Sequence, residues 1–311
     1  MISLLPAFFL GVVLLLFSAD SFVKVSSKVW LAFKISPLVI GTTVVAIGTS
    51  LPELAVSLIA SAKNDQGLAV GNIIGSNIVN VFLVLAVGIL LGNINIGTNK
   101  TQRNALVLVL ATMGYLFLSV LIPSARVFGL IMVFSAVVFT FFEVQMGIVG
   151  RNNEDKKYVN GKKNCKFSSK LFWALVFSSL GIAGGGFAVV HSIEKISLLT
   201  GYSTTVLGLS ITAIATSLPE LLTTVFCCKK DQGKIATGDI LGSNIYNLLL
   251  IGGIISLFSP TKTILMKDFV VLGMATFCLV FLVFRYPGRK VPRKFGIILL
   301  LFFFAYMFTL R

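Results

Sequence analysis

Charged residues are scarce in this sequence. Only 12% of its 311 residues are charged, 56% are hydrophobic, and the mean hydropathy is +0.97. A soluble globular protein is about one quarter charged. This scarcity excludes an ordinary soluble domain and indicates a polytopic membrane protein, long enough for about ten spans of about 20 residues each.

Residues that form metal sites and disulfides are also few. The single histidine, His191, lies at the end of a predicted span and excludes a multi-histidine metal site. The four cysteines have no CxxC spacing, so we expect small buried thiols and neither disulfides nor a structural metal. With no metal motif, an enzyme such as an intramembrane protease is not expected, and no cofactor is predicted.

The excess of positive charge has a membrane explanation. The formal net charge is +15, which in a soluble protein would suggest nucleic-acid binding. Of the 26 Lys and Arg residues, twenty fall on one face of the predicted topology, and the other face has six: Lys63, Arg126, Lys195, Lys262, Lys267 and Arg311. Positive residues collect in short cytoplasmic loops. The bias predicts an orientation with both termini outside. We therefore expect a plasma (inner) membrane protein whose positive charge lies mostly in cytoplasmic loops, and no nucleic-acid partner.

Ten apolar segments divide the chain into two halves. The first five lie at roughly 3–22, 36–62, 68–92, 104–122 and 126–148, and the second five at roughly 170–191, 203–228, 235–258, 267–285 and 294–310. The first has no basic n-region or small-residue cleavage site, which indicates a span and not a signal peptide. The fold class predicted is therefore an all-α protein of ten transmembrane helices: a first five-helix repeat (1–148), a polar, basic cytoplasmic linker (149–169) and a second five-helix repeat (170–311).

Two motifs occur once in each half. Residues 41–54, GTTVVAIGTSLPEL, return as residues 208–221, GLSITAIATSLPEL. Residues 71–80, GNIIGSNIVN, return as residues 238–247, GDILGSNIYN. Because each half has an odd number of spans, equivalent helices cross the membrane in opposite directions. This arrangement predicts the inverted repeat of secondary transporters, with a site near the midplane.

Both copies of the first motif place a proline and a carboxylate inside an apolar run. Pro52 and Pro219 lack an N–H, so the carbonyls of Gly48 and Ala215 lose their helical donors, and both helices are predicted to break. An ionisable residue in a span is costly unless a partner satisfies it. The alternative interpretation is an ordinary proline kink satisfied by hydroxyl side chains.

Oxygen-bearing side chains gather around these breaks. Two hydroxyl residues share a helix face with the glutamate in each copy, and the second motif contributes a polar stripe: Thr49, Ser50 and Glu53; Thr216, Ser217 and Glu220; Asn72, Ser76 and Asn80; Asp239, Ser243 and Asn247. These hard ligands suit calcium, sodium or magnesium. For the second motif, helix packing through its GxxxG pairs is the alternative.

The doubled motifs resemble the α-repeats of the cation/calcium exchanger superfamily, in particular its sodium/calcium exchanger branch, and the resemblance covers nearly the whole chain. It implies a calcium/sodium antiporter that works by alternating access. It also implies a central cation site with Glu53 and Glu220 as the principal calcium ligands. Carried over by motif position, the full ligand set is Ala46, Thr49, Ser50, Glu53, Ser76, Asn80, Ala213, Thr216, Ser217, Glu220, Ser243 and Asn247.

This sequence departs from the family pattern at three positions. Asn247 stands where some members have an aspartate, and Ala215 replaces a usual glycine. Asp239 replaces a usual asparagine, and with Asn72 it is a candidate for the ion pathway. Two interpretations of Asp239 stay open: it attracts cations at the cytoplasmic mouth, or it is a solvated residue at a helix start. Glu143 lies at a predicted span end, where we expect a structural role.

The transported ions leave alternatives open. Two glutamates carry two negative charges, so one calcium ion neutralises the site. The counter-ion could instead be a proton, since a buried carboxylate can titrate upward, or potassium could be co-transported. A cation channel using the same oxygens is a different class, against which the inverted repeat argues. Calcium, sodium and the lipid bilayer are thus the expected partners, and the sequence does not determine whether the chain forms homo-oligomers.

Overall fold

The computed structural model describes residues 4–32, 46–92, 94–96, 99–122, 124–149, 169–229, 233–258, 266–287 and 289–310. Nearly all of the predicted linker lies outside these residues, and so does the beginning of the first motif, residues 41–45. The described part of the chain is mostly helical.

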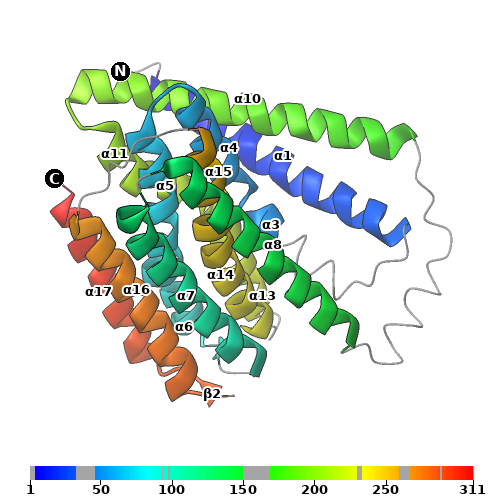
Figure 1. The fold of residues 1–311 in the computed structure, drawn as a ribbon, viewed down its shortest axis with the longest axis vertical. Helices are drawn as coiled ribbons and strands as arrows, with labels where there is room; N and C mark the ends of the chain where they lie inside the picture. Colours follow the sequence, from blue (N-terminus) through cyan, green and yellow to red (C-terminus); the bar gives the residue numbers. More distant parts are fainter. Residues whose placement is uncertain are drawn as a thin grey trace.

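Six long helices have no internal break. They are α1 (Leu4–Ala32), α7 (Asn99–Leu121), α8 (Ala125–Val149), α10 (Ser169–Thr200), α16 (Met266–Arg285) and α17 (Arg293–Thr309). Figure 1 shows α7, α16 and α17 side by side in one bundle, while α1 and α10 run together away from it. Both chain ends lie toward the upper end in this view.

Four further segments are helical but interrupted. They are α3 (Ala46–Thr49) with α4 (Leu51–Ala62); α5 (Gln66–Val79) with the π-helical turn η2 (Asn80–Leu85) and α6 (Ala86–Leu91); α11 (Thr204–Leu207) with η3 (Gly208–Thr212), α12 (Ala213–Thr216) and α13 (Leu218–Lys229); and α14 (Gly233–Tyr246) with η4 (Asn247–Ile251) and α15 (Gly252–Phe258). Every interruption falls in or beside one of the repeated motifs.

Two short strands join the chain near one end of the bundle. β1 (Asn95–Ile96) pairs antiparallel with β2 (Arg289–Lys290), with Asn95 opposite Lys290. The pairing ties the loop after α6 to the loop before α17. Strands were not predicted, because two-residue strands have no hydrophobic period that a sequence could reveal.

Eight helical segments in the described residues are long and apolar enough to cross a membrane. The 17 residues of α17 and the 12 of α4 are shorter than a typical span. The chain is therefore a multi-pass helical membrane protein. Two predicted spans end too early: α1 continues to Ala32 and α10 to Thr200. The charged residues of α1 do not end this helix, because Asp20 pairs with Lys24 one turn further on, at 2.5 Å. In α10, Glu194 pairs with Lys63 at 2.7 Å.

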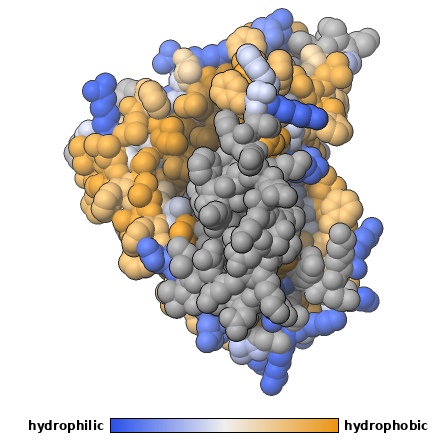
Figure 2. Space-filling model, turned by 90° about the vertical axis from the view of Figure 1, so that its right-hand side faces the viewer, coloured by the Kyte–Doolittle hydropathy of each residue, from blue (hydrophilic) through white to orange (hydrophobic). Residues whose placement is uncertain are grey.

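The helices that carry the second motif form the centre of the molecule. In the most apolar 18-residue stretches of the segments Gln66–Leu91 and Gly233–Phe258, 83% and 78% of the residues are buried, against 28% in those of α1 and α10. Large apolar side chains such as Phe134, Leu198 and Phe304 instead point outward. On the face shown in Figure 2, hydrophobic side chains cover much of the coloured surface, and most of the hydrophilic ones lie toward the upper and lower ends. This is the pattern of a protein that lipid surrounds.

The pair formed by α1 and α10 depends on two small residues. A Cβ atom built on Gly185 would lie 2.6 Å from the Leu15 nitrogen and 2.8 Å from the Gly11 carbonyl oxygen. A Cβ atom built on Gly11 would lie 2.9 Å from the Ala188 Cβ. The two backbones therefore touch, as is common where small residues line a membrane interface.

We expect Gly185→Val to force α1 and α10 apart and to destabilise the protein by about 1–3 kcal/mol, the usual cost of overpacking. Thermal unfolding of the purified protein in detergent measures this. Gly273→Ala is the matched control, because nothing lies within 4 Å of its added Cβ, and the change should be neutral or slightly stabilising. Equal unfolding temperatures for the two variants would contradict the close packing.

Candidate functional site

Both proline-containing helices break where the sequence predicts it. Ser50 separates α3 from α4 with φ −86° and ψ 7°, and Ser217 separates α12 from α13 with φ −82° and ψ 9°. Each proline then lies in the first turn of the second half-helix, where its missing N–H costs no hydrogen bond. Glu53 and Glu220 follow at once and lie at helix N-termini, whose dipoles favour negative charge.

At the first break, Thr49 connects the two halves of the chain. Its hydroxyl donates to Asp239 Oδ1 at 3.1 Å and lies 3.2 Å from the Ser243 hydroxyl. Both partners are on α14. The solvated helix-start interpretation of Asp239 is therefore wrong: α14 begins six residues earlier, at Gly233, and this carboxylate is only 5% exposed.

At the second break, Thr216 makes the corresponding contacts. Its hydroxyl donates to Asn72 Oδ1 at 3.2 Å and lies 3.3 Å from the Ser76 hydroxyl on α5. Each of these residues lies 167 positions before or after its counterpart at the first break. The two broken segments thus make the same contacts with the motif-bearing helix of the other half.

Glu53 is fully buried and partly hydrogen-bonded. Ser217 donates to its Oε1 at 3.2 Å, and the hydroxyls of Thr216 and Ser76 lie near the same carboxylate. Its Oε2 has no hydrogen-bond partner. The Asn72 amide donates to the Glu53 backbone carbonyl at 3.3 Å and to Ser57 Oγ at 2.9 Å, which ties α5 to α4.

Glu220 is fully buried, and its carboxylate makes fewer hydrogen bonds than that of Glu53. Neither of its carboxylate oxygens makes a hydrogen bond of normal geometry, although the Ser243 hydroxyl lies close by. The carboxylates of Glu53 and Asp239 are near enough to repel that of Glu220. No salt bridge between described residues includes any of these three acids. A buried charge costs several kcal/mol unless it is paired or neutralised, so these carboxylates require a cation or a proton.

Two asparagines complete the centre, and each begins a π-helical turn. Asn80 donates to Asn244 Oδ1 at 3.1 Å, and its own Oδ1 has no partner. Both side-chain polar atoms of Asn247 are buried without partners. π-helical turns occur often at functional sites, and here η2 and η4 start at Asn80 and Asn247. Nothing in the sequence had indicated them.

Asn244 was missing from the predicted set. It accepts from Asn80 and donates to the Asn77 carbonyl at 3.5 Å, so it joins α14 to α5. The repeat contained a usable signal, because Asn77 and Asn244 hold the same place in GSNxxN. In the second motif we predicted only polar residues spaced four apart, and this spacing includes neither Asn77 nor Asn244.

The remaining predicted ligands are also close to the breaks. Ser50 is buried, and its hydroxyl has no partner. The Ala213 carbonyl already accepts from the Ser217 N–H at 3.0 Å, and the Thr216 hydroxyl lies 3.4 Å away, so this carbonyl would have to give up or share its hydrogen bond to bind an ion. Ala46 is the first residue of α3.

A cavity reaches this centre from one direction. Its volume is about 460 Å³, and its walls include Asp20 of α1, Thr49 of α3 and Pro219 of α13. The corresponding interface in the other half is packed: a Cβ atom built on Gly186 of α10 would lie 2.9 Å from Ile59 and 3.3 Å from Ala55 of α4. Among the described residues, a cavity therefore opens between α1 and α13, whereas α10 and α4 are packed together.

Glu143 differs from the acids of this centre. It is only 3% exposed, but it forms salt bridges with Arg103 and, at 3.0 Å, with Lys100, both on α7. This joins α8 to α7, as expected for a structural carboxylate.

We expect Glu143→Gln to destabilise the protein by about 1–3 kcal/mol, because it leaves two cations near a buried position, and to leave cation binding unchanged. Glu194→Gln is the control, since the salt bridge of Glu194 with Lys63 is about a quarter to a third exposed and should contribute at most about 1 kcal/mol. Thermal unfolding and calcium binding in detergent check both. A loss of calcium binding in Glu143→Gln would contradict the structural role.

These features define a multi-pass helical membrane protein with a buried acidic centre lined by oxygen atoms. The chain belongs to the sodium/calcium exchanger protein family, whose sequence profile matches residues 3–145 and 170–310. The predicted resemblance is therefore confirmed.

Two relatives match over nearly their whole length. The chain is 32% identical to the sodium/calcium exchanger MaX1 of Methanosarcina acetivorans, covering 97% of this chain and 96% of that one. It is 33% identical to the putative antiporter CaxA of Alkalimonas amylolytica, covering 96% of each. The solved structure of the sodium-calcium exchanger NCX_Mj, soaked with sodium, superposes with a TM-score of 0.69 at 28% identity over the full length of both chains.

Proposed function

We propose that this protein is a secondary-active antiporter that exchanges calcium for sodium across the membrane. The observation that carries the proposal is the cluster of fully buried carboxylates, Glu53 and Glu220, in which three of four oxygens lack a hydrogen-bond partner. MaX1 and NCX_Mj are both named as sodium/calcium exchangers. Hard oxygen ligands around two negative charges suit a calcium ion or a set of sodium ions.

The proposed ligands are the two glutamates, the hydroxyls beside them and the paired polar residues of α5 and α14. The full set is Ala46, Thr49, Ser50, Glu53, Ser76, Asn80, Ala213, Thr216, Ser217, Glu220, Ser243 and Asn247, with Asn72 and Asp239 along the ion pathway. What supports it is that contacts such as Ser217 to Glu53 and Thr49 to Ser243 cross between the halves. Ligands from both halves can then close around one ion.

The same contacts support two inverted five-helix repeats, 1–148 and 170–311, of a ten-helix protein. In an inverted repeat, one half can occupy the open arrangement while the other occupies the closed one. The cavity between α1 and α13, opposite the packed α10–α4 interface, is such a difference. Movement of the α1–α10 pair would exchange the two arrangements and give alternating access.

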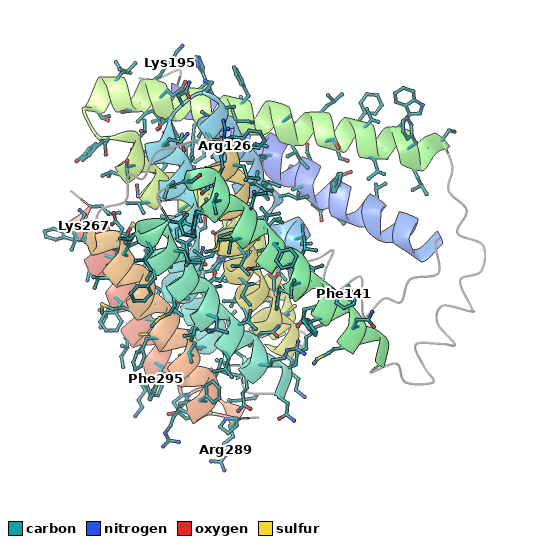
Figure 3. The ribbon with its side chains drawn as sticks, in the orientation of Figure 1. Arg126, Phe141, Lys195, Lys267, Arg289 and Phe295 are labelled. Atoms are coloured by element: carbon teal, nitrogen blue, oxygen red, sulfur yellow. The ribbon has the colours of Figure 1, made fainter. Side chains whose placement is uncertain are left out.

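The loop charges support an orientation with both termini outside and residues 149–169 in the cytoplasm. Lys195, Arg126 and Lys267 lie toward the upper end in Figure 3, and Arg289 lies at the lower end. On the proposed topology the lower end is cytoplasmic.

A cysteine-labelling experiment tests this orientation. In a background without the four native cysteines, Lys195→Cys should react with a membrane-impermeant maleimide added to intact cells. Arg289→Cys should react only after permeabilisation. The reverse pattern would invert the topology, and labelling of both in intact cells would contradict the membrane arrangement.

Transport itself is tested in sodium-loaded proteoliposomes, with sodium, potassium and pH gradients varied singly. We expect calcium uptake that requires internal sodium and falls at least tenfold in Glu53→Ala and Glu220→Ala, because each removes half of the proposed charge. Glu194→Ala, a carboxylate outside the site, should retain uptake.

The outcomes separate the alternatives. Uptake driven by a pH gradient alone would replace sodium with protons, and a potassium requirement would indicate co-transport. Calcium flux with no counter-ion requirement would indicate a channel. Exchange retained in both glutamate variants would contradict the assignment of the site.

A further inference from the structure

The two halves of the site differ by one charge. At the second break, Thr216 donates to a neutral amide, Asn72; at the first break, Thr49 donates to a carboxylate, Asp239. The geometries are closely matched, with distances of 3.2 and 3.1 Å. The difference between them is therefore mainly electrostatic.

Asn72 and Asp239 also differ in how many of their side-chain polar atoms make hydrogen bonds. Asn72 accepts from Thr216 and donates to both the Glu53 carbonyl and Ser57, so its amide is fully used in holding helices together. Asp239 accepts from Thr49, but its Oδ2 is buried without a hydrogen-bond partner. A buried carboxylate oxygen with no donor and no basic neighbour in a described salt bridge is costly, unless a cation occupies the space beside it.

The position of Asp239 connects the cavity with the central acids. Thr49 lines the cavity between α1 and α13, and its hydroxyl contacts both Asp239 and Ser243. Ser243 in turn lies close to the Glu220 carboxylate. An ion that enters from this cavity meets Thr49 first, then the carboxylate of Asp239, and then Glu220.

We propose that Asp239 joins the already proposed ligands Thr49 and Ser243 as the charged member of a subsite on the side of the α1–α13 cavity, and that its carboxylate makes the transport site select divalent over monovalent ions from that side. This inference rests on the proposed exchange function and specifies how its site treats the two ions. The subsite has no charged counterpart at the second break, where the amide of Asn72 replaces the carboxylate. The two sides of the transport cycle therefore differ in calcium affinity.

The physical basis is that Coulomb energy is proportional to the charge of the ion. Removing one negative charge at a fixed distance costs calcium twice the free energy that it costs one sodium ion. If removal of the charge weakens sodium binding about threefold per ion, it should weaken calcium binding about tenfold. The reason is that doubling the free-energy cost squares the factor by which the affinity falls.

Asp239→Asn tests this relation with little structural change. The amide oxygen can still accept from Thr49, and the new NH₂ group takes the place of an oxygen that had no partner. In purified protein, we expect equilibrium binding of radioactive calcium to weaken about tenfold and sodium competition to weaken about threefold per ion. In inside-out and right-side-out vesicles, the calcium KM should rise mainly on the side of the cavity.

Two further variants separate charge from structure. Asp239→Glu keeps the charge and should stay closer than Asp239→Asn to the wild-type calcium-to-sodium affinity ratio. Glu194→Gln removes a carboxylate far from this site and should change neither affinity. Unfolding temperatures in detergent show whether each variant is folded.

The outcomes also distinguish this inference from the proposed function. Unchanged affinities in Asp239→Asn, or equal losses for calcium and sodium, would overturn the subsite even if wild-type exchange is intact. Wild-type protein that shows no sodium-dependent calcium uptake would overturn the exchange function. The change in the calcium-to-sodium affinity ratio between wild type and Asp239→Asn would still decide the role of Asp239.

Discussion

The structure depends on burying carboxylates where no basic side chain of the described chain neutralises them. Glu53 and Glu220 are fully buried, and most of their oxygens have no hydrogen-bond donor. In a membrane interior, such charges destabilise the fold unless a cation or a proton neutralises them. On the proposed function, this ties the stability of the centre to its cations, and it explains why so many hydroxyl and amide groups converge on a place that apolar side chains would otherwise fill.

Local backbone irregularities hold this centre together. Ser50 and Ser217 interrupt two helices just before the prolines, and the π-helical turns η2 and η4 begin at Asn80 and Asn247. Each device turns polar groups toward the interior. Around them, backbone contacts at small residues such as Gly185 allow helices to approach closely, so that the irregular segments remain buried in protein and away from lipid.

The two halves make matching contacts, but they differ in how tightly the corresponding helix interfaces are packed and in charge. One face is open between α1 and α13 and the other is packed between α10 and α4, with Gly186 in the closed interface. The carboxylate of Asp239 lies on the open side, and the amide of Asn72 lies on the other. On the proposed alternating-access cycle, this difference in charge would make the site treat ions differently on its two sides.

Hydrophobic period, repeated motifs and proline positions were sufficient to predict the helical membrane class and the breaks beside Glu53 and Glu220. They also predicted the described helix ends to within about five residues, except at the ends of α1 and α10; the predicted start of the second segment, at residue 36, lies outside the described residues. These features are local: an apolar run must span lipid, and a proline must end its turn wherever it occurs. Tertiary structure alone decided which groups meet. The burial of Asp239, the role of Asn244 and the side on which the cavity opens depend on packing between segments more than 150 residues apart, and no local pattern encodes that packing.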